Sequence, residues 1–191
     1  MIRRKFQNVD PILIAGLMAT VAAIALFLAV GTSSAGAASG GVGMPTEQPT
    51  VAGDKARLTR KGKAIAPESA PERVKAAIAA ANKIRNKPYI YGGGHSSFND
   101  KGYDCSGAVS YALRGGRFLK SPMPSTGYMG GWGEKGKGKW ITTYANSGHM
   151  YTVIAGLRWD TSGTNGSGPS WQKTLRSPAG GDYVVRHPKG H

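Results

Sequence analysis

The chain has 191 residues, a formal net charge of +15 and a single cysteine. One cysteine cannot form a disulfide within the chain, and it offers no cysteine cluster for a zinc site. The positive charge favours anionic partners such as wall polymers or a membrane surface, whereas the spread of the basic residues and the lack of a recognisable motif argue against nucleic acid.

Residues 1–37 have the pattern of a secretory signal. Basic residues open the chain, an uncharged apolar run covers residues 12–30, and small residues follow it. Ala35-Gly36-Ala37 fits a cleavage site with the cut after the second alanine. The apolar run is also long enough to cross a bilayer, so an uncleaved anchor is the alternative. Either way the sequence predicts that the remainder lies outside the membrane, secreted or associated with the cell envelope.

Residues 38–66 are predicted to form a flexible basic linker. They are rich in Gly, Pro, Ala and Thr and show no apolar period. Residues 54–63 contain five lysines and arginines, which either hold the protein on an anionic surface or form a solvated charge run. The remainder, residues 67–191, is long enough for one domain with its own core.

A first amphipathic helix is predicted from about residue 70 to residue 85. Ser69 and Glu72 have the spacing of a capping box, and Pro71 suits the first helical turn. The helix should end before Pro88. Apolar residues recur at helical spacing at Val74, Ala77, Ile78, Ala81 and Ile84.

The lone cysteine, Cys105, opens a second predicted helix. It follows a loop with glycines at positions 92–94, which let the backbone turn closely. In the first turn of a helix, the positive end of the dipole stabilises a thiolate. A small buried cysteine is the structural alternative, but the flanking Asp104, Ser106 and Gly107 are polar or small and favour a nucleophile.

A nucleophilic thiol needs a base within reach, and the chain has four histidines, at positions 95, 149, 187 and 191. His191 ends the chain and is expected to be disordered. His95 lies in the glycine loop, where histidines are more often exposed than catalytic. His149 begins a predicted strand over residues 149–154, a rigid element at an open edge, and is therefore the candidate base.

A predicted hairpin supplies a partner for this histidine. If a two-residue turn follows the strand, Tyr151 faces Asp160. Because strand side chains alternate, Asp160 then shares a face with His149 and can fix its tautomer. A slip of one residue would turn Asp160 away, which leaves Asn146 and His187 as the alternative orienting residues.

These motifs resemble the NlpC (p-sixty) cysteine peptidases of bacterial cell walls. The matching pieces lie between residues 72 and 187 and are Pro88-Tyr89, Gly92-Gly93, Asp104-Cys105-Ser106-Gly107 and the Gly-His pair before a strand. The resemblance implies an α+β fold with a papain-like core, in which the helix that carries the cysteine packs on an antiparallel sheet. It also implies hydrolysis of peptidoglycan stem peptides, typically between D-γ-glutamyl and a diamino acid. We expect a monomer that needs no metal or cofactor.

By position, the resemblance implies that Cys105 is the nucleophile and His149 the base. Asp160 would take the third place, which is more often a histidine in the family. Tyr89 would place its hydroxyl near the thiol and the oxyanion, although core packing is its structural alternative. The two neighbours of the cysteine, Asp104 and Ser106, would hold the amine end of the substrate.

Two segments differ from the family pattern, residues 130–140 and the tail from residue 168 to residue 188. Residues 130–140, rich in glycine and lysine, are predicted to form a mobile basic loop over the cleft. Residues 183–186 are predicted to form the last strand, and Trp171 a core side chain. Two other functions fit the same residues: an amidase or acyltransferase on the same fold, and a basic wall-binding protein without activity.

Overall fold

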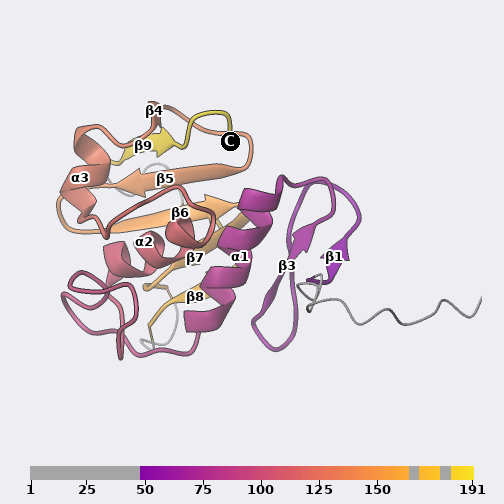
Figure 1. The fold of residues 1–191 in the computed structure, drawn as a ribbon, viewed down its shortest axis with the longest axis horizontal. Coiled ribbons are helices and arrows are strands. Elements are labelled where there is room, and N and C mark those ends of the chain that lie inside the picture. The colour runs from indigo at the N-terminus through magenta and orange to yellow at the C-terminus, as the bar shows by residue number, and fades with distance from the viewer. Residues whose placement is uncertain (1–47, 164–167, 177–181) are drawn as a thin grey trace, which may run out of the picture. The chain divides into compact units, whose positions relative to one another are not determined.

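The computed structural model describes residues 48–163, 168–176 and 182–191, which form an α+β fold (Figure 1). The helices are α1 (Glu72–Ile84), α2 (Cys105–Gly115) and α3 (Ser125–Gly130). The strands are β1 (Thr50–Val51), β2 (Arg57–Leu58), β3 (Ala64–Pro67), β4 (Glu134–Lys135), β5 (Ile141–Ala145), β6 (Met150–Ile154), β7 (Leu157–Asp160), β8 (Ser170–Gln172) and β9 (Val184–His187). The predicted signal segment lies outside the described residues. Among the helices that are described, none has the length and apolarity to cross a membrane.

The main sheet has six strands in the order β4-β9-β5-β6-β7-β8, and every neighbouring pair is antiparallel. The helices α1 and α2 pack against each other and cover one face of this sheet (Figure 1). The fold is therefore α+β with a cysteine-bearing helix on an antiparallel sheet, as the sequence predicts.

The hairpin between β6 and β7 has the register predicted from the sequence. Thr152 pairs with Trp159, and Ile154 pairs with Leu157. The two turn residues have positive φ angles, 47° at Ala155 and 84° at Gly156, as a type I′ turn requires. The twist of such a turn matches that of the flanking strands, so the turn fixes which side chains share a face.

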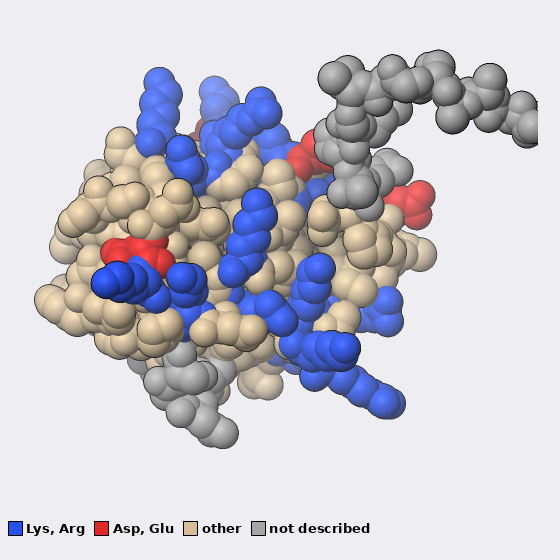
Figure 2. Space-filling model, turned by 60° about the horizontal axis from the view of Figure 1, so that its bottom comes forward, with Lys and Arg blue, Asp and Glu red and all other residues tan. Residues whose placement is uncertain are grey.

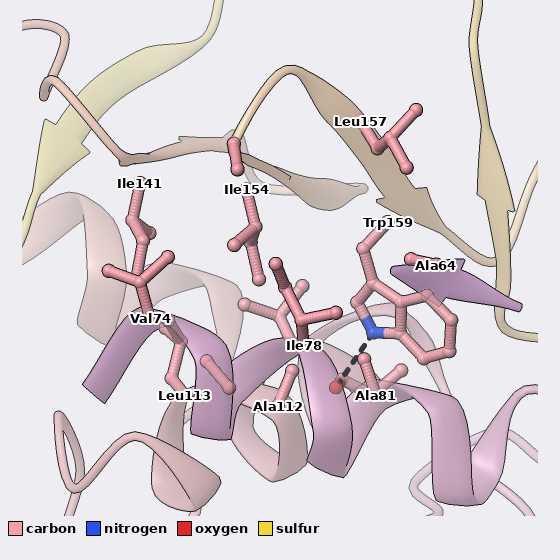
Figure 3. Packing of buried hydrophobic residues seen from close by; sticks show 14 of the residues in the cluster. Ala64, Val74, Ile78, Ala81, Ala112, Leu113, Ile141, Ile154, Leu157 and Trp159 are labelled. Carbon is pink, nitrogen blue, oxygen red and sulfur yellow. Dashed lines mark hydrogen bonds between the residues drawn. The ribbon is translucent and has the colours of Figure 1, made fainter. Parts of the chain in front are cut away.

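The core lies between α1, α2 and the central strands (Figure 3). Figure 3 shows helix side chains facing sheet side chains across this layer: Val74, Ile78, Ala81, Ala112 and Leu113 opposite Ile141, Ile154, Leu157 and Trp159. The indole N–H of Trp159 donates to the carbonyl oxygen of Ala108 at 3.0 Å, which ties β7 to α2. The two helices meet so closely that a side chain at Gly115 would collide with Ala80.

A buried asparagine in α1 joins the two ends of the domain sequence. The Asn82 side chain accepts from the backbone N–H of Ala64 at 2.9 Å and donates to its carbonyl oxygen at 2.7 Å. It also accepts from the indole N–H of Trp171 at 3.1 Å. Trp171 is 5% exposed and packs on Trp159, which confirms its predicted place in the core.

The described part of the predicted linker, residues 48–66, is not an unstructured segment. It contributes to a small sheet with the order β1-β3-β2. Ala64 and Ala66 are buried in the core, and the Ala56 N–H donates to the carbonyl oxygen of Ala155 at 2.8 Å. These strands are too short to show an apolar period, and their stabilisation comes from contacts with α1 and the hairpin turn. Residues 38–47 lie outside the described part.

The predicted start of α1 is right in position but wrong in its cap. Pro71 is the N-cap residue, and no side chain caps the helix. The Ser69 hydroxyl instead donates to the carbonyl oxygen of Gly53 at 2.6 Å, and Glu72 pairs with Lys75. Ser69 therefore joins the β1 region to α1 and does not form the predicted capping box.

Three predictions for the last third of the chain also need correction. Within residues 130–140, β4 pairs with β9, so this segment includes an edge strand and is not a free loop. His191 is ordered: its carbonyl oxygen accepts from the N–H groups of Trp140 and Ile141, and its ring contacts Phe118. The last strand is found one residue later than predicted, at Val184–His187.

Candidate active site

The start of α2 presents Cys105 on a rigid support. Asp104 is the N-cap residue, and its carboxylate accepts from the backbone N–H of Gly107 at 2.7 Å and of Gly92 at 3.1 Å. A side chain at position 107 would collide with the carbonyl oxygen of Gly93, so only glycine fits where the loop crosses the helix. One carboxylate thus fixes both the helix start and the glycine loop beside the thiol.

His149 lies directly before β6, and its Nε2 atom is 2.9 Å from Oδ1 of Asp160. The structure therefore brings together the histidine and the carboxylate that the hairpin register placed on one face. Asn146 accepts from the backbone N–H of His149 at 2.8 Å and so holds the turn, not the ring. His187 lies elsewhere, 3.4 Å from Glu134.

The electrostatic surroundings of His149 favour its imidazolium form. Burial alone would lower its pKa, but hydrogen bonding to Asp160 and to Cys105 outweighs burial and raises the pKa to about 9. Because Nε2 faces Asp160, the other ring nitrogen, Nδ1, is the one left for the thiol. The site thus places a cationic ring between the cysteine sulfur and a buried carboxylate.

Asp160 is surrounded by charged and polar groups that were not predicted from the sequence. Its side chain is fully buried, and Oδ2 lies 3.3 Å from Nε of Arg158 and 3.0 Å from Nε of Arg176. Oδ1 also accepts from the backbone N–H of Ser162 at 2.9 Å. Burial would raise the pKa of Asp160, but its bonds to His149, Ser162 and Arg176 hold the pKa below its usual value. The carboxylate is therefore ionised where His149 needs it.

One of these partners was visible in the sequence. Arg158 lies two residues before Asp160 in β7, so alternation puts both on one face of the sheet. Arg176 follows β8 and reaches back over a connection with no period, so nothing in the sequence places it. It also hydrogen-bonds the Ser162 hydroxyl, and Ser162 in turn lies 3.3 Å from Nε2 of His149.

Tyr89 is partly exposed, at 45%, so core packing is not its main role. Partial burial and the negative charges of Cys105 and Asp104 raise the pKa of its hydroxyl. The hydroxyl accordingly keeps its proton at neutral pH and is available as a donor near the thiol.

His95 forms a polar cluster with the two neighbours of the cysteine. Its Nε2 atom lies 3.0 Å from Oδ1 and 3.1 Å from Oδ2 of Asp104, and 3.1 Å from the Ser106 hydroxyl. The Ser106 hydroxyl is also 3.1 Å from Asp104. His95 is therefore not the free surface residue that its loop position indicates, and it contacts both residues predicted to hold the substrate amine.

The chemistry available at this place is nucleophilic acyl transfer. Cys105 supplies the sulfur, His149 a proton donor, and Asp160 the charge that orients the ring. In the residues that the structure covers, no three His, Cys, Asp or Glu side chains converge as metal ligands would.

No protein-family model and no curated protein matches the chain. Among the solved structures that match are the peptidoglycan hydrolase RipB of Mycobacterium tuberculosis, with 24% identity and a TM-score of 0.45, and a hypothetical invasion protein of the same bacterium, with 20% and 0.45. NlpC1 of Trichomonas vaginalis matches with 18% identity and a TM-score of 0.44. All three TM-scores lie below 0.5.

These matches are partial. The match to RipB covers 60% of this chain and 64% of RipB, and the match to NlpC1 covers 62% and 45%. The hypothetical invasion protein is covered to 74%, by 75% of this chain. The chain thus spans less than two thirds of two of these three proteins, and a functional assignment depends on its own site.

Proposed function

We propose that the protein is a peptidoglycan hydrolase of NlpC type, a cysteine endopeptidase that acts outside the membrane. The observation that carries the proposal is the arrangement of Cys105 at the start of α2 beside His149, whose ring is held by the buried Asp160. The resemblance of the surrounding motifs to the NlpC peptidases supports the substrate class, a stem peptide cut between D-γ-glutamyl and a diamino acid.

In the proposed reaction, the Cys105 thiolate attacks the amide carbon and a tetrahedral oxyanion forms. Backbone N–H groups at the start of α2, which have no partner within a helix, and the Tyr89 hydroxyl donate to this oxygen. The His149 imidazolium gives its proton to the leaving amine, and a thioester remains on Cys105. Neutral His149 then takes a proton from water, which attacks the thioester, and the thiolate leaves.

Digestion of purified peptidoglycan tests this proposal directly. We expect mass spectrometry to show fragments that end in a free D-γ-glutamyl carboxylate, with a matching new amino terminus on the diamino acid. Whole stem peptides released with their first residue intact would indicate an amidase, and a gain in mass on an acceptor would indicate an acyltransferase. An undigested wall would support the non-catalytic alternative and contradict the proposal.

The pKa of His149 predicts the alkaline limit of activity. Because the imidazolium must protonate the leaving amine, kcat/KM should fall as the pH rises through about 9, where His149 loses its proton. The measurement is kcat/KM for a soluble stem peptide against pH. Asp160→Asn should move this limit to lower pH, because the charge that raises the pKa of His149 is lost. A limit in the wild type near the ordinary histidine value of about 6.5 would contradict the proposed ion pair.

A further inference from the structure

A basic hollow lies beside the contact between α1 and α2. It has a volume of about 470 Å³ and opens where the small residues Ala80 and Gly115 let the helices approach. Four cationic side chains line it: Lys83, Arg114, Arg117 and Lys120. None of the described residues that line this hollow is acidic, so the charge they give it is of one sign.

A second hollow, of about 510 Å³, continues the first. The two share Lys83 and Tyr111, and the second adds Lys87 and Lys101 together with one acidic residue, Asp100. We call the joined feature the basic groove, with the cationic residues Lys83, Lys87, Lys101, Arg114, Arg117 and Lys120. Within the described parts of the chain, none of these six forms an ion pair.

The Asp100 carboxylate is already hydrogen-bonded to backbone N–H groups. It accepts from the N–H groups of Gly94 at 2.9 Å and of Lys101 at 2.6 Å. These bonds also hold its pKa below the usual value. The carboxylate therefore stays ionised but compensates only a small part of the groove's positive charge.

The Arg114 side chain and the Arg117 backbone are held in place before any ligand arrives. The Arg114 guanidinium lies over the Phe98 ring, 4.5 Å from its centroid. Arg117 has a φ angle of 60°, in the left-handed region that favours glycine. Its N–H donates to the Arg114 carbonyl oxygen at 2.8 Å, and its own carbonyl oxygen accepts from Arg73 at 2.7 Å. This is the usual conformation of the residue that follows a helix C-cap, and the Phe118 N–H closes the end of α2 by donating to the Leu113 carbonyl oxygen at 2.9 Å.

We propose that the basic groove binds a linear phosphodiester polymer with a polyol backbone, as a site separate from the catalytic one. Arginine and lysine side chains bind phosphate groups, and arginine does so through two parallel hydrogen bonds. Two joined hollows form a track, which suits a thin charged chain better than a single small anion. Figure 2 shows how few Asp and Glu side chains interrupt the Lys and Arg side chains on one face of the molecule.

The shape of the groove argues against a membrane and against nucleic acid. A bilayer meets a protein most readily through protruding apolar side chains, and the exposed large apolar residues do not line the groove. Single-stranded nucleic acid needs exposed aromatic rings on which bases stack. Tyr111, the aromatic residue shared by both hollows, is only partly exposed and packs against Tyr103. A polymer without bases has no such requirement.

Cys105 lines neither hollow: the first lies at the far end of α2 from the thiol, and the second is lined in part by residues of the 99–103 segment, before α2 begins. Cys105 opens the helix and Arg114 lies in its last turn, nine residues later, which corresponds to about 14 Å along the helix. A polymer in the groove thus leaves Cys105 free. Lys83 and Arg114 also lie in the last turns of α1 and α2, where the helix dipoles favour cations. A test should therefore use groove residues outside both helices.

The test measures the binding of labelled poly(glycerol phosphate) to the purified protein by fluorescence anisotropy at several salt concentrations. The groove variant combines Lys87→Gln, Arg117→Gly and Lys120→Gln. We expect its Kd to rise on the order of tenfold, and the slope of log Kd against log salt to fall by about two, since each lost phosphate contact removes about 0.7. Arg117→Gly relieves the backbone strain, so weaker binding cannot be attributed to unfolding, which thermal melting will verify.

The control variant also removes three positive charges, but from the segment before α1: Lys55→Gln, Lys61→Gln and Lys63→Gln. We expect its Kd to stay close to that of the wild type. Equal weakening by both variants would show a non-localised charge effect and overturn the proposal. Tighter binding to phosphatidylglycerol vesicles, or to single-stranded DNA of equal charge, would also overturn it. Because poly(glycerol phosphate) contains no peptide bond, this result is independent of the proposed peptidase activity.

Discussion

We expect Cys105→Ala to abolish hydrolysis of peptidoglycan and of a soluble stem peptide, and His149→Ala to do so almost as completely. Without the sulfur no thioester forms, and without the ring neither the thiolate nor the leaving amine is assisted. Residues that act as one unit have non-additive effects. The variant that combines Cys105→Ala with His149→Ala should therefore be no slower than Cys105→Ala alone. The fall in kcat should be on the order of 10⁴-fold or more. The measurement is single-substrate kinetics on the soluble peptide.

A fold control separates lost chemistry from lost structure. Cys105 is partly buried at the surface end of α2, and the cap is made by Asp104, so removal of the sulfur should leave the melting temperature nearly unchanged. Iodoacetamide should alkylate the wild type faster than His149→Ala, because the imidazolium stabilises the thiolate. Wall digestion by Cys105→Ala at the wild-type rate would rule out the cysteine peptidase.

The parts of the site that follow from local geometry could be predicted from the sequence. A two-residue turn and strand alternation suffice to place Asp160 beside His149, and the register found is the one expected. Apolar spacing likewise placed α1 to within a few residues, and α2 begins at Cys105 as predicted. In each case the determining contacts lie within one helix or one hairpin.

The parts that depend on long connections could not be predicted. Arg176 reaches Asp160 across a connection without apolar period, and His95 reaches Asp104 through the geometry of a glycine loop. The strands β1–β3 have two to four residues each, too few to show alternation. Their pairing with one another and their packing on α1 are tertiary contacts, whereas composition alone indicated a linker.

The second large effect is expected at Asp160, in both activity and stability. Asp160→Ala leaves the buried Arg158 without its carboxylate partner, a loss that costs about 3–5 kcal/mol of the free energy of unfolding in comparable buried pairs. Asp160→Asn keeps the shape but not the charge, and His149 loses both its orientation and its raised pKa. We expect kcat for Asp160→Asn to fall on the order of 10²-fold. Chemical denaturation and peptide kinetics measure the two effects.

A matched control for stability is Glu134→Ala. This substitution also removes a carboxylate that faces a histidine, since Glu134 lies 3.4 Å from His187. The Glu134 side chain, however, is 50% exposed. Exposed pairs of this kind contribute about 0–1 kcal/mol, so this variant should melt close to the wild type and keep its activity. Equal destabilisation by Glu134→Ala and Asp160→Ala would mean that the buried network around Asp160 contributes no more to the free energy of unfolding than an exposed pair does.

The sharpest test of the ion pairs around Asp160 is how the loss of unfolding free energy in Asp160→Ala depends on pH. The pKa of Asp160 is lowered on folding, so its contribution to stability is present above its unfolded pKa, near 3.8, and is lost as the pH falls through the lower folded value. The pKa of His149 is raised, so the contribution of its pair with Asp160 is complete below about 6.5 and is lost as the pH rises through about 9. The difference in unfolding free energy between wild type and Asp160→Ala should therefore be largest between about pH 4 and pH 6.5 and should narrow on both sides of this window. A difference that stays constant from acid to alkaline pH would mean that Asp160 acts only by filling space, and that the charge on His149 does not depend on it.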